Sequence, residues 1–274
     1  MTFPVAMIPY TNMAPYRELG SPASCRFVPL VPSRSIEALR NNAVIAAAVP
    51  VGGLPALAGL TDFLGNFGIA AAVQSMSVLF FSRFPLNDMG SKTRIQVTGE
   101  SASSVRLLYL LMAYHRGVDD IPRLAGPNEP GDGELLIGDR ALLRMKAHQA
   151  GPPDASEGRA YTHVTDLASA WFTQHNLPFV FARWVVRRDA PAEARAALES
   201  WLSEFKAREN ELVARATPAA AAELGLEPQT VLDYFRVIRR CLDETDSAGQ
   251  ALFMEECRRY GLTDASAGPF KAVN

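Results

Sequence analysis

The stretch LPFVFARWVVRR, from Leu177 to Arg188, is an apolar run of strand length that ends on arginines. A continuous apolar run of this length, rich in β-branched and aromatic residues, predicts a strand that is buried on both faces. It follows a complete α/β unit and precedes a long helical region that begins near Pro191. We therefore predict a return strand, where the chain crosses from one lobe of a two-lobed protein to the other.

Both sides of this stretch show the alternation of strand and helix that is typical of α/β proteins. The N-terminal section has a helix start after Pro32 and predicts strands over residues 3–8, 27–31 and 44–49. The apolar run at residues 69–82 predicts one long strand or a strand pair. The second section predicts further strands at residues 94–97 and 134–137. The C-terminal region predicts helices over residues 192–216, 218–224, 227–242 and 247–260.

These patterns predict an α/β fold of two lobes with a ligand cleft between them. We expect the first lobe to comprise residues 1–88 and 184–274, and the second lobe to comprise residues 89–183. Folds of this class bind ligands at the carboxyl ends of strands and at helix N-termini. Candidate site residues are therefore expected in polar segments at those positions.

The composition excludes several classes of partner. The 27 Lys and Arg residues nearly balance the 29 Asp and Glu residues, so the chain lacks the basic surplus typical of nucleic-acid binding. The N-terminus has no signal-peptide pattern, and proline and glycine interrupt the apolar run at residues 43–60, which argues against a membrane span. Cys25, Cys241 and Cys257 have unrelated spacings and predict free thiols in a reducing compartment. We expect a cytoplasmic protein without membrane or nucleic-acid partners.

Three polar segments occupy expected ligand-binding positions. One is an N-terminal loop, and the other two are serine-rich helix starts. Their candidate binding residues are Tyr10, Thr11 and Asn12, then Ser33 and Ser35, then Ser101, Ser103 and Ser104. Hydroxyl and free N–H groups at a helix start can bind an anion. Either serine cluster can instead serve only as an N-cap, which contributes about 1 kcal/mol, although the second cluster has more hydroxyls than one cap needs.

Three further polar positions lie within or just after apolar strands: Ser77, Gly138 and Asp139. A hydroxyl buried in an apolar strand needs a partner, which for Ser77 is either a neighbouring carbonyl or a ligand. The Asp139 carboxylate can cap the next helix, contact a ligand or brace the cleft between the lobes.

The sequence has no recognised motif for metal or nucleophilic chemistry. The four histidines lack metal-ligand spacing, and no GxSxG, P-loop or GxGxxG is present. We expect no metal and no cofactor. Any acid–base step is then expected to use neutral polar groups, water or the substrate itself.

Seven segments, in order along about two-thirds of the chain, together resemble the chorismate dehydratase family of the futalosine-dependent menaquinone pathway. They resemble its sister enzyme, dihydroxynaphthoate synthase, more loosely. The segments are IPYTNMAP (8–15), VPSRSIEAL (31–39), AAAVPVGGL (46–54), GIAAAVQSMSVLFFSRFPL (68–86), VTGESASSVRLLYLLM (97–112), ELLIGDRAL (134–142) and DLASAWFTQHNLPFVFARWVVR (166–187).

The resemblance implies a type II periplasmic-binding-protein-like fold and the dehydration of chorismate to 3-[(1-carboxyvinyl)oxy]benzoate. It implies an elimination in which the enolpyruvyl carboxylate of the substrate can act as the base. By motif, Asn12 and Ser77 match family residues and are the expected catalytic residues, while Ser103 and Ser104 would hold a carboxylate of this dicarboxylate substrate. We also expect that the protein can form a homodimer.

The sequence departs from the family pattern at four positions, Ala43, Ile45, Gly53 and Met76. Two other hypotheses therefore stand beside the dehydratase. One is a non-catalytic cytoplasmic binding protein for a small carboxylate. The other is the sister lyase, which a histidine in the cleft would favour.

Overall fold

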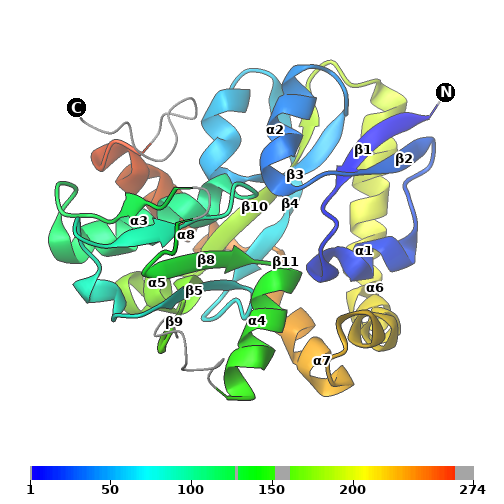
Figure 1. Ribbon diagram of the computed structural model, residues 1–274. Coiled ribbons are helices and arrows are strands. Elements are labelled where there is room, and N and C mark those ends of the chain that lie inside the picture. Colours follow the sequence, from blue (N-terminus) through cyan, green and yellow to red (C-terminus); the bar gives the residue numbers. More distant parts are fainter. Residues whose placement is uncertain (1, 127–128, 152–160, 263–274) are drawn as a thin grey trace.

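Two mixed β-sheets form the framework of the protein (Figure 1). The computed structural model describes residues 2–126, 129–151 and 161–262. The first sheet has six strands in the order β11-β4-β10-β3-β1-β2, and the second has five in the order β7-β6-β8-β5-β9. Helices pack around both sheets, which confirms the predicted α/β class.

The first sheet begins as a parallel unit and is completed by strands from distant parts of the chain. Its strands are β1 (Phe3–Met7), β2 (Cys25–Pro29), β3 (Ala46–Pro50), β4 (Thr61–Ala71), β10 (Phe179–Arg187) and β11 (Ile238–Cys241). Strand β1 is parallel to β2 and β3, with α2 (Pro32–Arg40) as the crossover helix between them. Strand β10 lies antiparallel between β3 and β4.

Every residue of β10 is buried, because the strand lies inside the sheet and is covered on both faces. Its bounds fall within the predicted stretch at residues 177–188. The predicted return strand is therefore confirmed.

The second sheet carries the helices that surround the other half of the molecule. Its strands are β5 (Val78–Ser82), β6 (Arg94–Gln96), β7 (Arg123–Leu124), β8 (Gly133–Ile137) and β9 (His163–Asp166). Its helices are α3 (Ala102–Arg116), α4 (Asp139–Gln149) and α5 (Leu167–His175). All residues of α3 from Ser103 to Ala113 are buried, since this helix packs between the two halves.

The run at residues 69–82 contains two strands that belong to different sheets. Strand β4 ends at Ala71, and β5 pairs with β8 and β9 of the second sheet. The chain therefore crosses between sheets at residues 72–77, and it returns between α5 and β10. The predicted boundary at residue 88 groups β5 with the first lobe although β5 pairs within the second sheet, and the one at residue 184 falls inside β10. We propose boundaries at residues 72–77 and 176–178 instead; residues 263–274 of the predicted first lobe lie outside the described residues.

Asp166 fixes the first crossing. Its carboxylate accepts hydrogen bonds from the backbone N–H groups of Ser75 (2.9 Å) and Met76 (2.7 Å) and from the Ser75 hydroxyl (3.1 Å). It also caps α5 by accepting from the N–H groups of Ala168 (2.9 Å) and Ser169 (3.2 Å). Burial raises the pKa of the Asp166 carboxyl, and these N–H donors oppose the rise. In the loop held by Asp166, the backbone of Met76 has a φ of 59°, a value that residues other than glycine rarely adopt.

The C-terminal helices differ from the predicted ones at three points. Helix α6 (Ala192–Leu224) runs for 33 residues through Pro218, where two helices were expected. Helix α7 (Pro228–Val237) ends early, because the following residues pair with the edge of β4 as β11. Helix α8 (Glu244–Arg259) starts three residues before the predicted start. For α7 and α8, a strand pairing and a helix cap outweigh local propensity.

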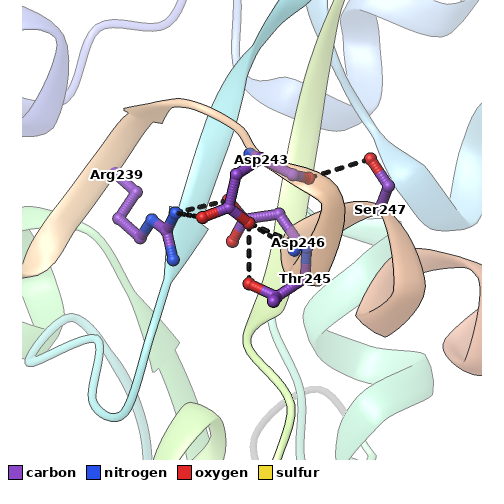
Figure 2. A network of polar contacts seen from close by, with 5 residues as sticks. All are labelled: Arg239, Asp243, Thr245, Asp246 and Ser247. Carbon is purple, nitrogen blue, oxygen red and sulfur yellow. Dashed lines mark hydrogen bonds and ion pairs between the residues drawn. The ribbon is translucent and has the colours of Figure 1, made fainter.

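Figure 2 shows why α8 begins where it does. The Asp243 carboxylate accepts from the N–H groups of Thr245 (2.9 Å) and Asp246 (3.0 Å), while Asp246 accepts from the Asp243 N–H (2.9 Å), which forms a capping box. Arg239 of β11 pairs with both carboxylates, and the Ser247 hydroxyl donates to the Asp243 carbonyl. These contacts fasten α8 to the edge of the first sheet.

From this anchor, α8 runs along β10 and reaches α3. Gly249 lies directly against the carbonyl of Pro178, at the return crossing, where there is no space for a Cβ atom.

Among the helices in the described part of the chain, none has the length and apolar character needed to cross a membrane.

We expect Gly249→Ala to destabilise the protein. Alanine stabilises a helix by about 0.5–1 kcal/mol relative to glycine, but overlap with a packed backbone typically costs about 1–3 kcal/mol. A net loss of about 1–2 kcal/mol should appear in urea unfolding. Gly99→Ala is the control, because a Cβ at this exposed position meets no atom. Equal stability of the two variants would contradict the tight packing of α8.

Asp166→Ala should lower the free energy of unfolding by about 2–4 kcal/mol, because it leaves several buried N–H groups without an acceptor. Asp166→Asn, which keeps one acceptor oxygen, should lose less. Asp233→Ala serves as the control: this exposed carboxylate contacts Gln229 and Arg236 of its own helix, and the loss of such surface contacts should change stability by less than about 0.5 kcal/mol. A loss for Asp166→Ala no larger than this control would refute the proposed anchor.

Candidate functional site

A cavity lies between the two sheets, with walls from both halves of the chain. The empty space within it, including solvent at its open side, is about 490 Å³. The polar residues of its wall are Tyr10, Asn12, Ser75, Ser77, Ser101 and Ser104. Most of the remaining wall is apolar and includes Ile8, Ile69, Val78, Ile137, Phe181 and Ile238.

The structure brings together six of the eleven residues predicted for the site. Those that line the cavity are Tyr10, Asn12, Ser77, Ser101, Ser104 and Gly138. The five that do not line it are Thr11, Ser33, Ser35, Ser103 and Asp139. Which of them contact a substrate stays a prediction. The geometry does show what each of them bonds to.

Asn12 lies on a short 3₁₀ turn, Thr11–Met13, that follows β1. Its backbone carbonyl accepts from the guanidinium of Arg240 (3.3 Å). Its side chain lines the cavity, and its Oδ1 atom is buried without a hydrogen-bond partner among the described residues. A buried acceptor without a partner costs about 1–3 kcal/mol, so Oδ1 is available for a bound donor.

Asp139 braces the two halves of the chain and does not cap its own helix. The residue that caps α4 is Gly138, at a φ of 60°. Both Asp139 oxygens accept from the N–H of Thr11, at 2.9 and 3.2 Å, across 128 positions of sequence. Burial raises the pKa of this carboxyl, and the bond from Thr11 opposes the rise. Of the three alternatives from the sequence, the brace agrees with these contacts.

Tyr10 adds a second link across the cavity. Its hydroxyl donates to the carboxylate of Glu100 at 2.8 Å. Its ring lies against Gly138, where a Cβ atom would stand 2.9 Å from the ring carbons. Gly138 is therefore required both by its positive φ and by this close approach.

The serines at the start of α3 have two different roles. Ser101 is the N-cap, since its hydroxyl accepts from the N–H of Ser104 (3.2 Å), and the two hydroxyls lie 3.0 Å apart at the cavity wall. Ser103 faces away from the cavity. Its hydroxyl donates to the carbonyl of Phe181 (2.8 Å) and accepts from the N–H of Gly52 (3.1 Å), which ties α3 to the first sheet.

The serines of α2 do not cap that helix, contrary to expectation. The N-cap is Val31, and Pro32 occupies the first turn, where its missing N–H is no loss. The Ser35 hydroxyl donates back to the carbonyl of Pro32 at 2.6 Å. Ser33 reaches the second half of the chain through its backbone N–H, which donates to the carbonyl of Glu100 at 2.9 Å.

Ser77 lies one residue before β5 and is almost fully buried, at 3% exposure. Its carbonyl accepts from the N–H of Gly138 at 2.8 Å, and the buried Tyr234 phenol lies near its hydroxyl. Burial raises the pKa of Tyr234 well above its usual range. Sequence reasoning missed Tyr234 and Ser75, although Ser75 shares the polar context of Ser77 in an otherwise apolar run.

The histidines lie away from the cavity wall. The ring of His175 packs against Trp171, with ring centroids 4.1 Å apart, and burial lowers its pKa. Within residues 2–126, 129–151 and 161–262, no group of three or more His, Cys, Asp and Glu side chains is arranged to hold a metal ion.

Comparison with solved structures shows the fold. A protein from Archaeoglobus fulgidus, AF1704, superposes with a TM-score of 0.67 at 16% identity, covering 95% of this chain and 98% of that one. The periplasmic aliphatic sulphonate binding protein SsuA from Escherichia coli superposes with a TM-score of 0.60 at 13% identity, covering 97% and 94%. These likenesses confirm the predicted two-lobed, periplasmic-binding-protein-like fold.

Comparison of sequences shows the family. Residues 3–259 match the family described as menaquinone biosynthesis. A chorismate dehydratase from Thermus thermophilus is 33% identical over 202 residues, which cover 70% of this chain and 72% of that protein. The match extends over nearly all the described elements, from β1 to α8. The chain therefore belongs to the menaquinone biosynthesis family.

Proposed function

We propose that the protein is a chorismate dehydratase, which removes water from chorismate to give 3-[(1-carboxyvinyl)oxy]benzoate in menaquinone biosynthesis. The family match and the similarity to the Thermus enzyme support the reaction. The observation that carries the proposal is the cavity itself. Its wall contains both the buried Asn12 Oδ1, which has no hydrogen-bond partner among the described residues, and the serines Ser101 and Ser104 from the other half of the chain. The futalosine-dependent route, the cytoplasmic location and a homodimer stay predictions.

The reaction needs no oxidant or reductant. One ring C–H bond and the neighbouring C–OH bond break, the C–H electron pair becomes the third double bond of the ring, and the proton and hydroxide leave as water. Aromatisation of the ring favours the product. The substrate's own enolpyruvyl carboxylate is proposed to take the proton, which suits a cavity whose wall contains no carboxylate or histidine among the described residues.

Asn12 and Ser77 are proposed to position the leaving hydroxyl and the developing negative charge. Ser101 and Ser104 are proposed to bind the substrate carboxylates through their hydroxyls. Tyr10, whose hydroxyl donates to Glu100, is proposed to contact the substrate through its ring. Helix α3 begins at the cavity wall, so its N-terminal N–H groups add a favourable field for an anion.

Substrate entry is proposed to require separation of the lobes. The cavity lies between the lobes, and residues of both lobes form its wall. The Asp139–Thr11 and Tyr10–Glu100 hydrogen bonds join the two lobes beside the cavity. They would break when the lobes open and form again around the substrate.

The alternatives receive less support. The sister lyase would be favoured by a histidine in the cleft, and none of the four histidines lines the cavity. A non-catalytic binding protein would differ from the dehydratase in one respect: it would bind its ligand and release it chemically unchanged.

Incubation of the purified protein with chorismate should produce an aromatic product, which can be followed by its ultraviolet absorbance and by mass spectrometry. The Thermus chorismate dehydratase is the positive control. Saturable binding of chorismate without any loss of water would favour the binding-protein alternative and refute the proposed reaction.

Asn12→Ala and Ser77→Ala should each lower kcat by about 10²–10³-fold, the usual cost of losing one preorganised donor or acceptor at the reacting centre. Circular dichroism should show a retained fold. Ser82→Ala is the matched control, because Ser82 is also buried, lies at the far end of β5 and bonds to the carbonyl of Phe84. Rates near wild type for Asn12→Ala would remove Asn12 from the catalytic site.

A further inference from the structure

Arg240 of β11 is buried beneath the Asn12 loop, with only 2% of its surface exposed. One guanidinium nitrogen donates to the carbonyls of Phe235 (3.0 Å) and Ile238 (3.1 Å) and approaches the carboxylate of Glu209 (3.2 Å). The other donates to the carbonyl of Asn12 at 3.3 Å. The side chain thus connects three segments of the first lobe to the loop that carries Asn12.

A buried guanidinium is costly unless it is paired and hydrogen-bonded, and an apolar residue of similar volume often stabilises a core equally well. The contacts of Arg240 use the property that distinguishes arginine from other residues, namely a rigid planar fork that can hold several acceptors at fixed angles. These contacts therefore indicate that Arg240 serves to hold the backbone carbonyls in fixed positions, and not only to stabilise the fold.

The backbone of the Asn12 loop is held by charged groups at three consecutive residues. Arg17 donates to the carbonyl of Tyr10 (3.1 Å), Asp139 accepts from the N–H of Thr11 (2.9 Å), and Arg240 donates to the carbonyl of Asn12. Held in this way, Asn12 keeps its buried Oδ1 atom at the cavity wall, where no other group in the described part of the chain bonds to it. Of the three groups, Arg240 is the one that bonds Asn12 itself.

We propose that Arg240 is a positioning residue for the dehydration, which fixes the backbone of Asn12 so that its side-chain amide faces the substrate. This inference rests on the proposed function. It assigns Arg240 no contact with the substrate and no proton transfer. Its effect is expected in the chemical step, because a displacement of about 1 Å at a reacting group can cost about 10²-fold in rate.

The test compares Arg240→Lys with wild type on chorismate. Lysine keeps the charge but lacks the planar fork, so it cannot hold Asn12 together with the other carbonyls. We expect kcat to fall about 10- to 100-fold while KM changes less than about threefold. Arg187→Lys is the matched control, because Arg187 is also buried and bonds a backbone carbonyl and a carboxylate, but it lies at the C-terminal end of β10 and does not line the cavity. It should keep kcat within about twofold of wild type.

A double-mutant cycle separates positioning from a general loss of stability. If Arg240 acts through Asn12, adding Arg240→Lys to Asn12→Ala should slow the enzyme by less than about twofold further. Full additivity of the two losses, or an Arg240→Lys kcat equal to wild type, would overturn the proposal. A wild-type protein that does not dehydrate chorismate would instead refute the proposed function.

Crystal structures provide a readout that does not depend on turnover. In Arg240→Lys, or in Arg240→Gln if the lysine variant does not fold, the Asn12 side chain should leave its place at the cavity wall. An unmoved Asn12 would overturn the proposal. If neither variant folds, a wild-type complex with the benzoate product decides: Arg240 must still donate to the Asn12 carbonyl while the Asn12 amide contacts the product, and loss of either contact refutes the role.

Discussion

The half-buried carboxylate of Asp166 makes the interactions on which the arrangement of the two halves most depends. Where the chain leaves the first sheet, its backbone N–H groups have no strand partner, and burying them without acceptors would cost about 1–3 kcal/mol each. Asp166 supplies those acceptors and, with the same two oxygens, starts α5. The crossing, the start of β5 and the place of Ser77 at the cavity wall therefore follow from one side chain.

The return crossing is fixed by packing rather than by charge. Strand β10 is covered on both faces, and α8 lies so close to Pro178 that only glycine fits at position 249. Across the cavity, Ser103 joins α3 to β10, and Asp139 joins α4 to the Asn12 loop. The two lobes are thus linked by a few directional hydrogen bonds around the cavity, in addition to the apolar packing of α3 between the two halves.

Patterns local in sequence were enough to predict most of the strands, the α/β class and the two-lobed organisation. The misplaced features depend on partners far away in the chain. The residues of β11 have a helical sequence pattern, but they pair with the edge of β4 as a strand. Likewise, β5 directly follows the first-lobe strands in sequence, but it pairs with β8 and β9 of the second sheet. The site shows the same limit: Thr11 and Asp139 meet across 128 positions, and Arg240 meets Asn12 across 228. Residue type alone cannot separate a serine that faces the cavity, such as Ser104, from its neighbour Ser103, which faces the core.

The distribution of charge around the cavity suits a dicarboxylate that must react rather than merely bind. No lysine or arginine lines the wall in the described part of the chain, so a bound anion meets hydroxyls, an amide and the N-terminus of α3. A direct ion pair would stabilise the substrate and the transition state about equally, and interactions of that kind lower KM without raising kcat. The guanidinium of Arg240 bonds the backbone of Asn12 and does not line the cavity, so it can orient Asn12 without binding the substrate. Binding strength and orientation are thereby assigned to different residues, which allows the site to act on charge that develops only during the elimination.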